Sequence, residues 1–275
     1  MSAATTAPAP ARFGYAAARL FLRSVGRLSD GLSLCFDEGL TSGLMLEYVY
    51  RDRPSGRLGV GRWIDARFLA SPGWQAVRER RTLLESVLER GIASLRAAGR
   101  PVSLVDVASG PAGYVLAVLS RVGERDVTAR CRDLDERWLV RGRKEAARLG
   151  LQHVTFERGD ALDREALLAL TPRPNVAVAS GFYDWIVDDA MVRESFAIVS
   201  AALEPGGCFA LTHQTANPDL RFLNAVFTDF HHAPLNMKMR DTTMVHHWLG
   251  EAGFRIEDAR TDARHCYSVT LARRA

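Results

Sequence analysis

VSLVDVASGPAGYV, residues 102–115, is the stretch that decides the fold: an apolar run meets the acid Asp106 and then a loop of small residues. Small side chains let backbone N–H groups approach a ligand, and a helix after the loop presents an electropositive N-terminus. Taken alone, the stretch fits a ligand-binding loop and also an ordinary turn, because a small-residue loop after a strand is a weak signal. The residues downstream decide between the two.

Strand-like and helix-like segments alternate from residue 100 to the C-terminus. VTARCRD (127–133) and CFALTHQ (208–214) read as strands, whereas ERWLVRGRKEAARLG (136–150) has helical spacing. Such alternation predicts an α/β fold with a mostly parallel sheet, here of seven strands, covered by helices on both faces. The last two strands, FRIEDART and CYSVTLAR, have no helix between them, so we predict that the last strand is antiparallel.

The first hundred residues have a different character. Residues 13–99 read as helices, with a loop at 51–61 (RDRPSGRLGVG) and a long helix over about 72–98 that begins with Pro72 after Ser71. Residues 1–12, MSAATTAPAPAR, are predicted to be disordered and lack the apolar core of a signal peptide. We therefore predict a helical lid or extension over 13–99 and a ligand-binding domain over 100–275.

Composition narrows the range of partners. The chain has 275 residues, 47% of them hydrophobic, and a net charge of +4. The basic residues are scattered among acids, which disfavours a nucleic-acid partner. The four cysteines are far apart and the paired histidines would point apart on a helix, so we expect no metal site. No apolar run is long enough to span a membrane, and we expect a cytoplasmic monomer or homodimer with no membrane partner.

Two acids and a glycine-rich stop follow the opening loop along the chain. Asp133 lies 20 residues beyond Gly113, at the end of the second strand, where a carboxylate can accept both hydrogen bonds of a ribose diol. The third strand ends in Gly159-Asp160-Ala161, which places another carboxylate at the same edge of the sheet. ALEPGGCFALT (202–212) reads as a helix that stops at Pro-Gly-Gly and enters a strand.

In this order and at these spacings, the set resembles class I S-adenosylmethionine-dependent methyltransferases over residues 102–275. The resemblance implies a Rossmann-like fold and S-adenosylmethionine as cofactor, with its methionine part at the loop, its ribose at the first acid and its adenine at the second. The residues that match as cofactor-binding are Asp106, Ala108, Gly110, Gly113, Asp133, Leu134, Asp160, Ala161 and Ser180. Ala108 replaces the usual first glycine and Pro111 is unusual, which leaves the path of the loop open.

The N-terminal stretch 40–88 is similar to the helical lead-in of a group of bacterial methyltransferases. Members of that group commonly carry His-Gly-Arg after the loop glycine, where this chain has Pro-Ala-Gly. A dehydrogenase of the Rossmann type would leave the Gly-Asp-Ala and Glu-Pro-Gly-Gly stretches unexplained.

The residues after the fourth and fifth strands are the candidates for chemistry. Tyr183 is the first choice as catalytic residue, because its ring can face a sulfonium and its hydroxyl can orient an acceptor; a packing role is the alternative. His213 is a candidate general base, or else a strand-end histidine bonded to a carbonyl. The expected substrate pocket consists of Tyr50, Phe182, Trp185 and Gln214.

Two further groups carry open alternatives. Asp184 reads as a helix cap or as a base, and one of Arg78, Arg80 and Arg81 could clamp the methionine carboxylate. The resemblance implies methyl transfer to a small molecule in metabolism, with natural product biosynthesis in secondary metabolism as the expected setting. One alternative is intramolecular cyclisation of S-adenosylmethionine to azetidine-2-carboxylate and methylthioadenosine, with Tyr183 holding the chain. Another is a non-catalytic protein that only binds the cofactor.

Overall fold

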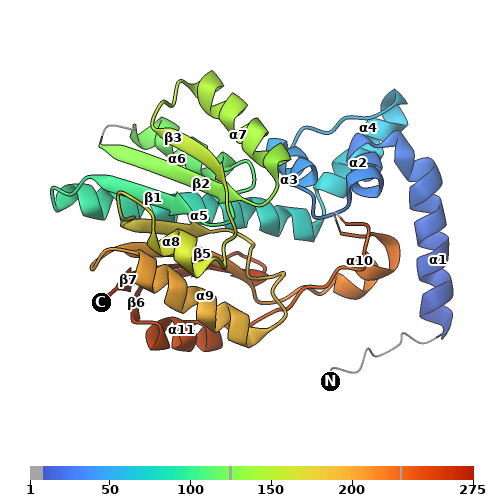
Figure 1. Ribbon diagram of the computed structural model, residues 1–275. Helices are drawn as coiled ribbons and strands as arrows, with labels where there is room; N and C mark the ends of the chain where they lie inside the picture. Colours follow the sequence, from blue (N-terminus) through green and yellow to red (C-terminus); the bar gives the residue numbers. More distant parts are fainter. Residues whose placement is uncertain (1–8, 124–125, 230) are drawn as a thin grey trace. The chain divides into compact units, whose positions relative to one another are not determined.

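The computed structural model describes residues 9–123, 126–229 and 231–275 (Figure 1). The chain divides into two compact units: residues up to Arg78 with Asn217–Asn236, and Glu79–Ala216 with Met237–Ala275. The predicted extension over 13–99 differs from the first unit, because residues 79–99 belong to the second unit and 217–236 to the first. Of the stretch 1–12 predicted to be disordered, residues 1–8 lie outside the described part and 9–12 belong to a helix.

The first unit is helical. It consists of α1 (Ala9–Ser24), the 3-10 helix η1 (Val25–Leu28), α2 (Asp30–Glu38), α3 (Gly43–Arg51), α4 (Leu58–Leu69), the first residues of α5 (Pro72–Ala97) and α10 (Leu220–Val226). The predicted long helix is confirmed as α5. The loop predicted over 51–61 is shorter, because α4 already begins at Leu58. This position of α4 requires glycine, because a Cβ added to Gly61 would lie 2.2 Å from the Leu28 carbonyl oxygen.

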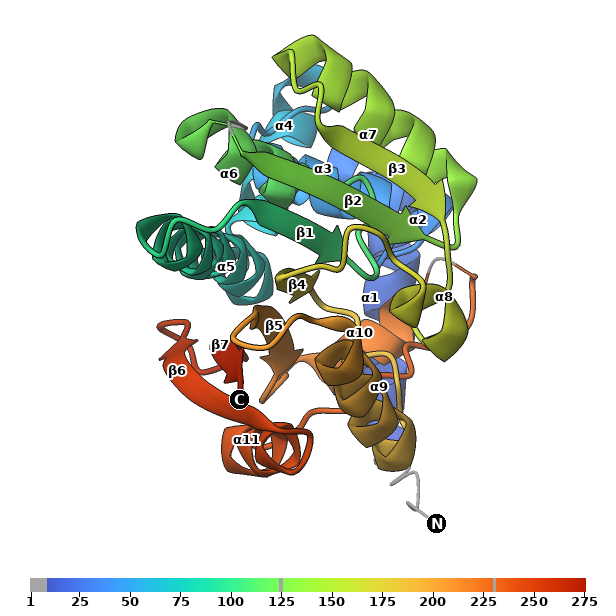
Figure 2. The ribbon, with the colours of Figure 1, turned by 60° about the vertical axis from the view of Figure 1, so that its left-hand side comes forward.

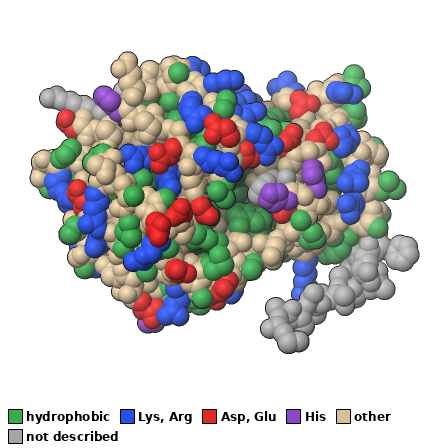
Figure 3. Space-filling view, in the orientation of Figure 1, with side chains coloured by type: hydrophobic (Ala, Val, Ile, Leu, Met, Phe, Trp, Pro, Cys, Tyr) green, Lys and Arg blue, Asp and Glu red, His purple; other side chains and the backbone are tan. Residues whose placement is uncertain are grey.

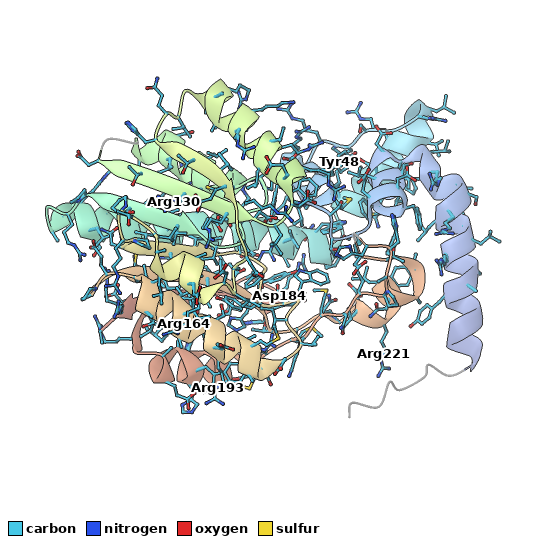
Figure 4. All side chains as sticks on the ribbon, in the orientation of Figure 1. Tyr48, Arg130, Arg164, Asp184, Arg193 and Arg221 are labelled. Carbon is cyan, nitrogen blue, oxygen red and sulfur yellow. The ribbon has the colours of Figure 1, made fainter. Side chains whose placement is uncertain are left out.

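A buried carboxylate ties the helices of the first unit together. Asp65 on α4 is fully buried and accepts hydrogen bonds from the Ser29 hydroxyl at 2.6 Å and the Gly31 N–H at 2.9 Å. Its other oxygen accepts from the Tyr48 hydroxyl and from the Ser55 N–H at 2.9 Å. The hydroxyl of Tyr48, labelled in Figure 4, thus links α3 to α4. Four donors satisfy the charge of one carboxylate without a cation.

A seven-stranded sheet forms the second unit (Figure 2). Its order is β3 (Val154–Arg158), β2 (Val127–Asp133), β1 (Val102–Asp106), β4 (Val176–Ala179), β5 (Cys208–Gln214), β7 (Tyr267–Arg274) and β6 (Phe254–Thr261). The pairs among β1 to β5 are parallel, and β7 is antiparallel to both β5 and β6. The predicted mostly parallel sheet with an antiparallel last strand is confirmed.

Two apolar cores lie on opposite faces of this sheet. Alternate strand residues point to each face, so Leu104 packs in one core and Val105 in the other. The first core includes α5, α6 (Gly113–Val122) and α7 (Glu136–Leu149), and the second includes α8 (Arg164–Leu168), α9 (Asp189–Ala202) and α11 (Thr242–Glu251). Among the helices so described, none is long and apolar enough to cross a bilayer.

Candidate functional site

The carboxyl ends of the five parallel strands lie at one edge of the sheet. The strand order reverses between β1 and β4, because β1 is followed in sequence by β2 on one side and later by β4 on the other. In open α/β sheets, ligands bind in the crevice outside such a switch point. The loops that follow β1 and β2, and those that follow β4 and β5, therefore hold the candidate site.

The loop after β1 is fastened to the acid at the end of β2. Gly110 and Ala112 both have left-handed backbone, with φ of 53° and 56°. The Gly110 N–H donates to Asp133 Oδ2 at 2.8 Å, and the Asp135 N–H donates to Asp133 Oδ1 at 2.9 Å. A Cβ added to Gly110 would meet nothing within 4 Å, so the loop backbone is open on that side.

Asp133 keeps capacity for a ligand. It is partly buried, and that burial raises the pKa of its carboxyl above the ordinary value. Each carboxylate oxygen has two acceptor positions, and each accepts one hydrogen bond from the loops, so two positions stay available for the hydroxyls of a diol. Leu134, the next residue, is 58% exposed and offers an apolar surface beside the acid.

Asp106 lies deeper, at the end of β1. It is fully buried, and its Oδ2 accepts a hydrogen bond from the Tyr114 hydroxyl at 2.5 Å. Its Oδ1 has no hydrogen-bond partner within the described chain. Burial raises the pKa of Asp106 to about 7, against the lowering effect of Tyr114. The structure thus leaves a buried acceptor oxygen at the end of β1, next to the small-residue loop.

The remaining matched positions lie on the loops of the same edge. Asp160 is exposed, and its Oδ1 accepts a hydrogen bond from the Leu162 N–H at 2.9 Å. Ala161 is buried in the core next to it, and Ala108 and Ser180 are half-buried after β1 and β4.

The three arginines proposed to clamp a carboxylate take separate positions. Arg81 on α5 donates from Nη2 to the Gly113 carbonyl oxygen at 3.2 Å, next to the first loop. Arg78 instead donates to the Leu69 carbonyl oxygen at 2.9 Å within the first unit. Arg80 is buried in the second unit and approaches a carboxylate of the protein itself.

That carboxylate belongs to a buried polar cluster at the ends of β4 and β5. Arg80 Nη1 lies 3.9 Å from Asp184 Oδ2, and its guanidinium lies 4.7 Å from the centre of the Tyr267 ring. Asp184 Oδ1 accepts from the Gln214 N–H at 2.6 Å, and Gln214 Nε2 donates to the Tyr267 hydroxyl at 3.1 Å. Figure 4 labels Asp184 within the second unit.

Two acceptor oxygens of this cluster have room for a donor. Gln214 Oε1 is buried and has no hydrogen-bond partner among the described residues. The contact of Asp184 Oδ2 with Arg80 is, at 3.9 Å, too long for a hydrogen bond. Burial raises the pKa of Asp184 to about 6, although Arg80 opposes this effect. The helix-cap interpretation of Asp184 is wrong, because Asp188 caps α9.

Arg240 holds the segment that carries Asp184. Its buried guanidinium donates to the carbonyl oxygens of Tyr183, at 2.7 Å, and Ile186, and to Asp189 Oδ1 at 2.9 Å. One side chain thereby fixes the backbone on both sides of Asp184. Nothing in the local sequence around residue 240 signals this role.

Tyr183 has a packing environment. Its side chain is 1% exposed, its ring makes edge contacts with Phe196 and Phe209, and its hydroxyl lies 3.2 Å from Ser195 Oγ. Burial raises the pKa of the phenol. This arrangement matches the packing alternative rather than the catalytic one.

His213 is buried on β5 and faces α11. Its Nε2 lies 3.4 Å from Thr242 Oγ1, and its Nδ1 has no partner among the described residues. Burial, with a smaller effect of the nearby His246, lowers the pKa of His213 to about 4. The imidazole is therefore neutral at neutral pH and a weak proton acceptor.

The other predicted pocket residues are spread over both units. Phe182 and Trp185 flank Tyr183 and Asp184 and are half-buried. Tyr50 lies on α3 of the first unit and is also half-buried. In Figure 3, positive and negative side chains are intermixed over the visible face, in line with the scattered charges of the sequence.

Known proteins are similar to this chain in sequence and in fold. YnbC of Escherichia coli strain K12, described as uncharacterized, is 34% identical over 266 residues. That match covers 96% of this chain and 45% of YnbC, so the chain spans about half the length of this relative. A family model described as "Putative methyltransferase" matches residues 1–274.

Solved structures repeat the fold at low sequence identity. A "possible exported protein" from Bordetella parapertussis superposes with a TM-score of 0.70 and 21% identity, covering 100% of this chain and 99% of that one. An O-methyltransferase family protein from Burkholderia thailandensis gives 0.59 and 19%, covering 91% and 72%. Magnesium protoporphyrin IX methyltransferase from Synechocystis, solved with bound S-adenosylhomocysteine, gives 0.56 and 13%, covering 94% and 99%.

These similarities agree with the order of strands, loops and acids. The cofactor that the family and the fold imply is S-adenosylmethionine. The chain belongs to the family described as "Putative methyltransferase" and has the Rossmann-like fold of class I S-adenosylmethionine-dependent methyltransferases.

Proposed function

We propose that the protein transfers a methyl group from S-adenosylmethionine to a small molecule bound beside the ends of β4 and β5. The observation that carries this proposal is the Gly110–Asp133 hydrogen bond, which holds an open backbone loop against a carboxylate with acceptor positions to spare. Family membership adds the type of reaction.

The residues present fit the implied cofactor. Asp133 would accept hydrogen bonds from the ribose hydroxyls, Leu134 would contact the adenine ring, and Asp160 would accept from the exocyclic amine. The open backbone around Gly110 and the unpartnered Asp106 Oδ1 would face the methionine part. When bound, S-adenosylmethionine supplies a methyl group on a sulfonium, which is a good leaving group.

The acceptor side requires alignment and proton transfer. Asp184 Oδ2 and Gln214 Oε1 would accept hydrogen bonds from the N–H or O–H group that becomes methylated. A carboxylate whose pKa is about 6 is ionised at neutral pH and can still take up the proton that the acceptor loses. Arg80 and Arg240 would keep this carboxylate oriented. His213, with its low pKa, would be confined to hydrogen bonding.

The other functions have less support at the level of residues. Cyclisation to azetidine-2-carboxylate would need Tyr183 to hold the aminobutyrate chain of the cofactor, but the Tyr183 hydroxyl lies against Ser195 in the core. A cofactor-binding protein without activity would need the same acids at β1 to β3 but no polar cluster at β4 and β5. The cytoplasmic location and the oligomeric state stay predictions from the sequence.

The test is turnover. Purified protein is incubated with S-adenosylmethionine and small-molecule fractions of a bacterial extract, and S-adenosylhomocysteine and methylthioadenosine are measured by mass spectrometry. We expect S-adenosylhomocysteine with one fraction, and a loss of about 100-fold in Asp184→Asn, the scale of general-base catalysis. Asp188→Asn, the same change at an exposed helix cap, should retain full activity.

Other products would point to the other functions. Methylthioadenosine formed without any fraction would favour cyclisation. Binding of the cofactor without any product would favour the non-catalytic function.

A further inference from the structure

The N-terminal end of α4, in the first unit, presents apolar and cationic side chains to solvent together. Leu58, Val60 and Trp63 are 79%, 56% and 66% exposed. Arg57 and Arg62 are exposed beside them. We name these five residues the α4 patch. Large apolar side chains at such exposure, gathered on the first turns of one helix, indicate a surface that meets a partner.

The positive charge of this patch is not balanced. Arg57 and Arg62 form no ion pair with a carboxylate within the described chain, and the acid of α4, Asp65, is buried and occupied by hydrogen bonds. Arg148, an exposed arginine of α7, by contrast pairs with Glu145 at 2.6 Å. The α4 patch therefore attracts anions.

The backbone at Leu58 provides a second observation. Its φ is 58°, in the left-handed region that a leucine rarely adopts. The Arg57 N–H donates to the Leu28 carbonyl oxygen at 2.8 Å, which fixes the chain just before this residue. The fold thus keeps Leu58 in an unfavourable conformation while its side chain points into water. Such conformations concentrate at functional positions.

The combination of groups selects the partner. A second copy of the patch would bring arginine against arginine. A nucleic acid would use the arginines but would leave Leu58 and Val60 against phosphates. An anionic lipid surface uses both kinds of side chain: guanidinium groups bind headgroup phosphates, while leucine, valine and tryptophan enter the boundary between headgroups and acyl chains.

We propose that the α4 patch binds the surface of a bilayer that contains anionic lipids. Binding at a surface needs no membrane-spanning helix. The sequence expectation of no membrane partner rests on the lack of such a helix, so it does not bear on surface binding. The proposal is independent of the proposed methyl transfer, since it uses no residue of the candidate site.

Vesicle cosedimentation tests the proposal. The full chain is mixed with vesicles of phosphatidylcholine alone and of phosphatidylcholine with phosphatidylglycerol. We expect binding to the second kind, weakened by salt. Arg57→Gln and Arg62→Gln should each weaken binding about fivefold, and Trp63→Ser about tenfold or more.

Matched controls use exposed residues of the second unit. Val140→Ser and Arg148→Gln, both on α7, should bind as the wild type does. All the changed side chains are exposed, so we expect every variant to fold. Circular dichroism melting of each variant checks this. Equal binding to both kinds of vesicle, no binding to either, or equal losses in patch and control variants would overturn the proposal. A dimer in light scattering that Trp63→Ser converts to monomer would overturn it in favour of a second copy.

Discussion

Arg240→Met is the substitution that most directly tests how the polar cluster is built. The guanidinium of Arg240 is buried and donates to two carbonyl oxygens, of Tyr183 and Ile186, and to the Asp189 carboxylate. Methionine fills a similar volume and keeps the apolar part of the side chain buried. The substitution therefore removes the donors while it largely preserves packing.

The magnitude follows from these three contacts. A hydrogen bond from a charged group contributes about 1.5–3 kcal/mol, and breaking one side of a buried ion pair costs about 3–5 kcal/mol. Asp189 is part-exposed and keeps Lys238 at 2.7 Å, so its share is small. We expect a loss of about 3–5 kcal/mol in the free energy of unfolding, mostly from the two unsatisfied carbonyl groups.

Urea unfolding followed by circular dichroism measures this loss as a shift of the midpoint at unchanged slope. Arg255→Met, at an exposed arginine of β6, is the control and should change the free energy of unfolding by less than about 0.5 kcal/mol. A loss below about 1 kcal/mol in Arg240→Met would refute the reasoning, because it would mean that the segment around Asp184 does not depend on this guanidinium.

Three other predictions concern stability. Asp65→Ala should lower the free energy of unfolding by about 3 kcal/mol or more in urea, because four donors lose their acceptor; a loss like that of an exposed Asp→Ala would contradict it. The raised pKa of Asp106 means that its folded form binds a proton more tightly than its unfolded form, so wild-type stability should fall as pH rises from about 4 to about 7. Midpoints at pH 5 and 8 should show this fall reduced in Asp106→Asn, and an equal fall in both proteins would refute it. Gly142→Ala should destabilise, since the new Cβ would lie 2.1 Å from the Phe156 ring, whereas the control Gly250→Ala, with nothing within 4 Å, should be neutral or stabilising in thermal melts.

The sequence predicted the features that depend on local order and spacing. Alternation of strands and helices specified the sheet, and the missing helix between the last two strands specified the antiparallel β7. The interval from Gly113 to Asp133 placed the second acid at the end of β2, where the structure connects it to Gly110. Hydrophobic periodicity and chain connectivity contain this information.

The features that the sequence missed depend on contacts between distant residues. Arg240 reaches the carbonyl group of Tyr183 from 57 positions away, and Arg80 on α5 approaches Asp184 in the segment after β4. The position of Tyr183 after β4 favours a catalytic role, yet its ring packs in the core against Phe196 and Phe209. The direction of a loop side chain depends on tertiary packing, for which one sequence has no local signal. The early start of α4 likewise depends on tertiary packing, since Gly61 in this helix permits a close approach to Leu28.

The most direct test of the account is calorimetric titration of S-adenosylhomocysteine into the wild-type protein, Asp133→Asn and Asp188→Asn. We predict binding by the wild type and by Asp188→Asn with equal affinity. For Asp133→Asn we predict an affinity that is lower by about tenfold or more, because the charged acceptor of the ribose hydroxyls is lost. No binding by the wild type, or equal binding by all three proteins, would contradict the assignment of the cofactor to the loop at Gly110 and the acid at Asp133.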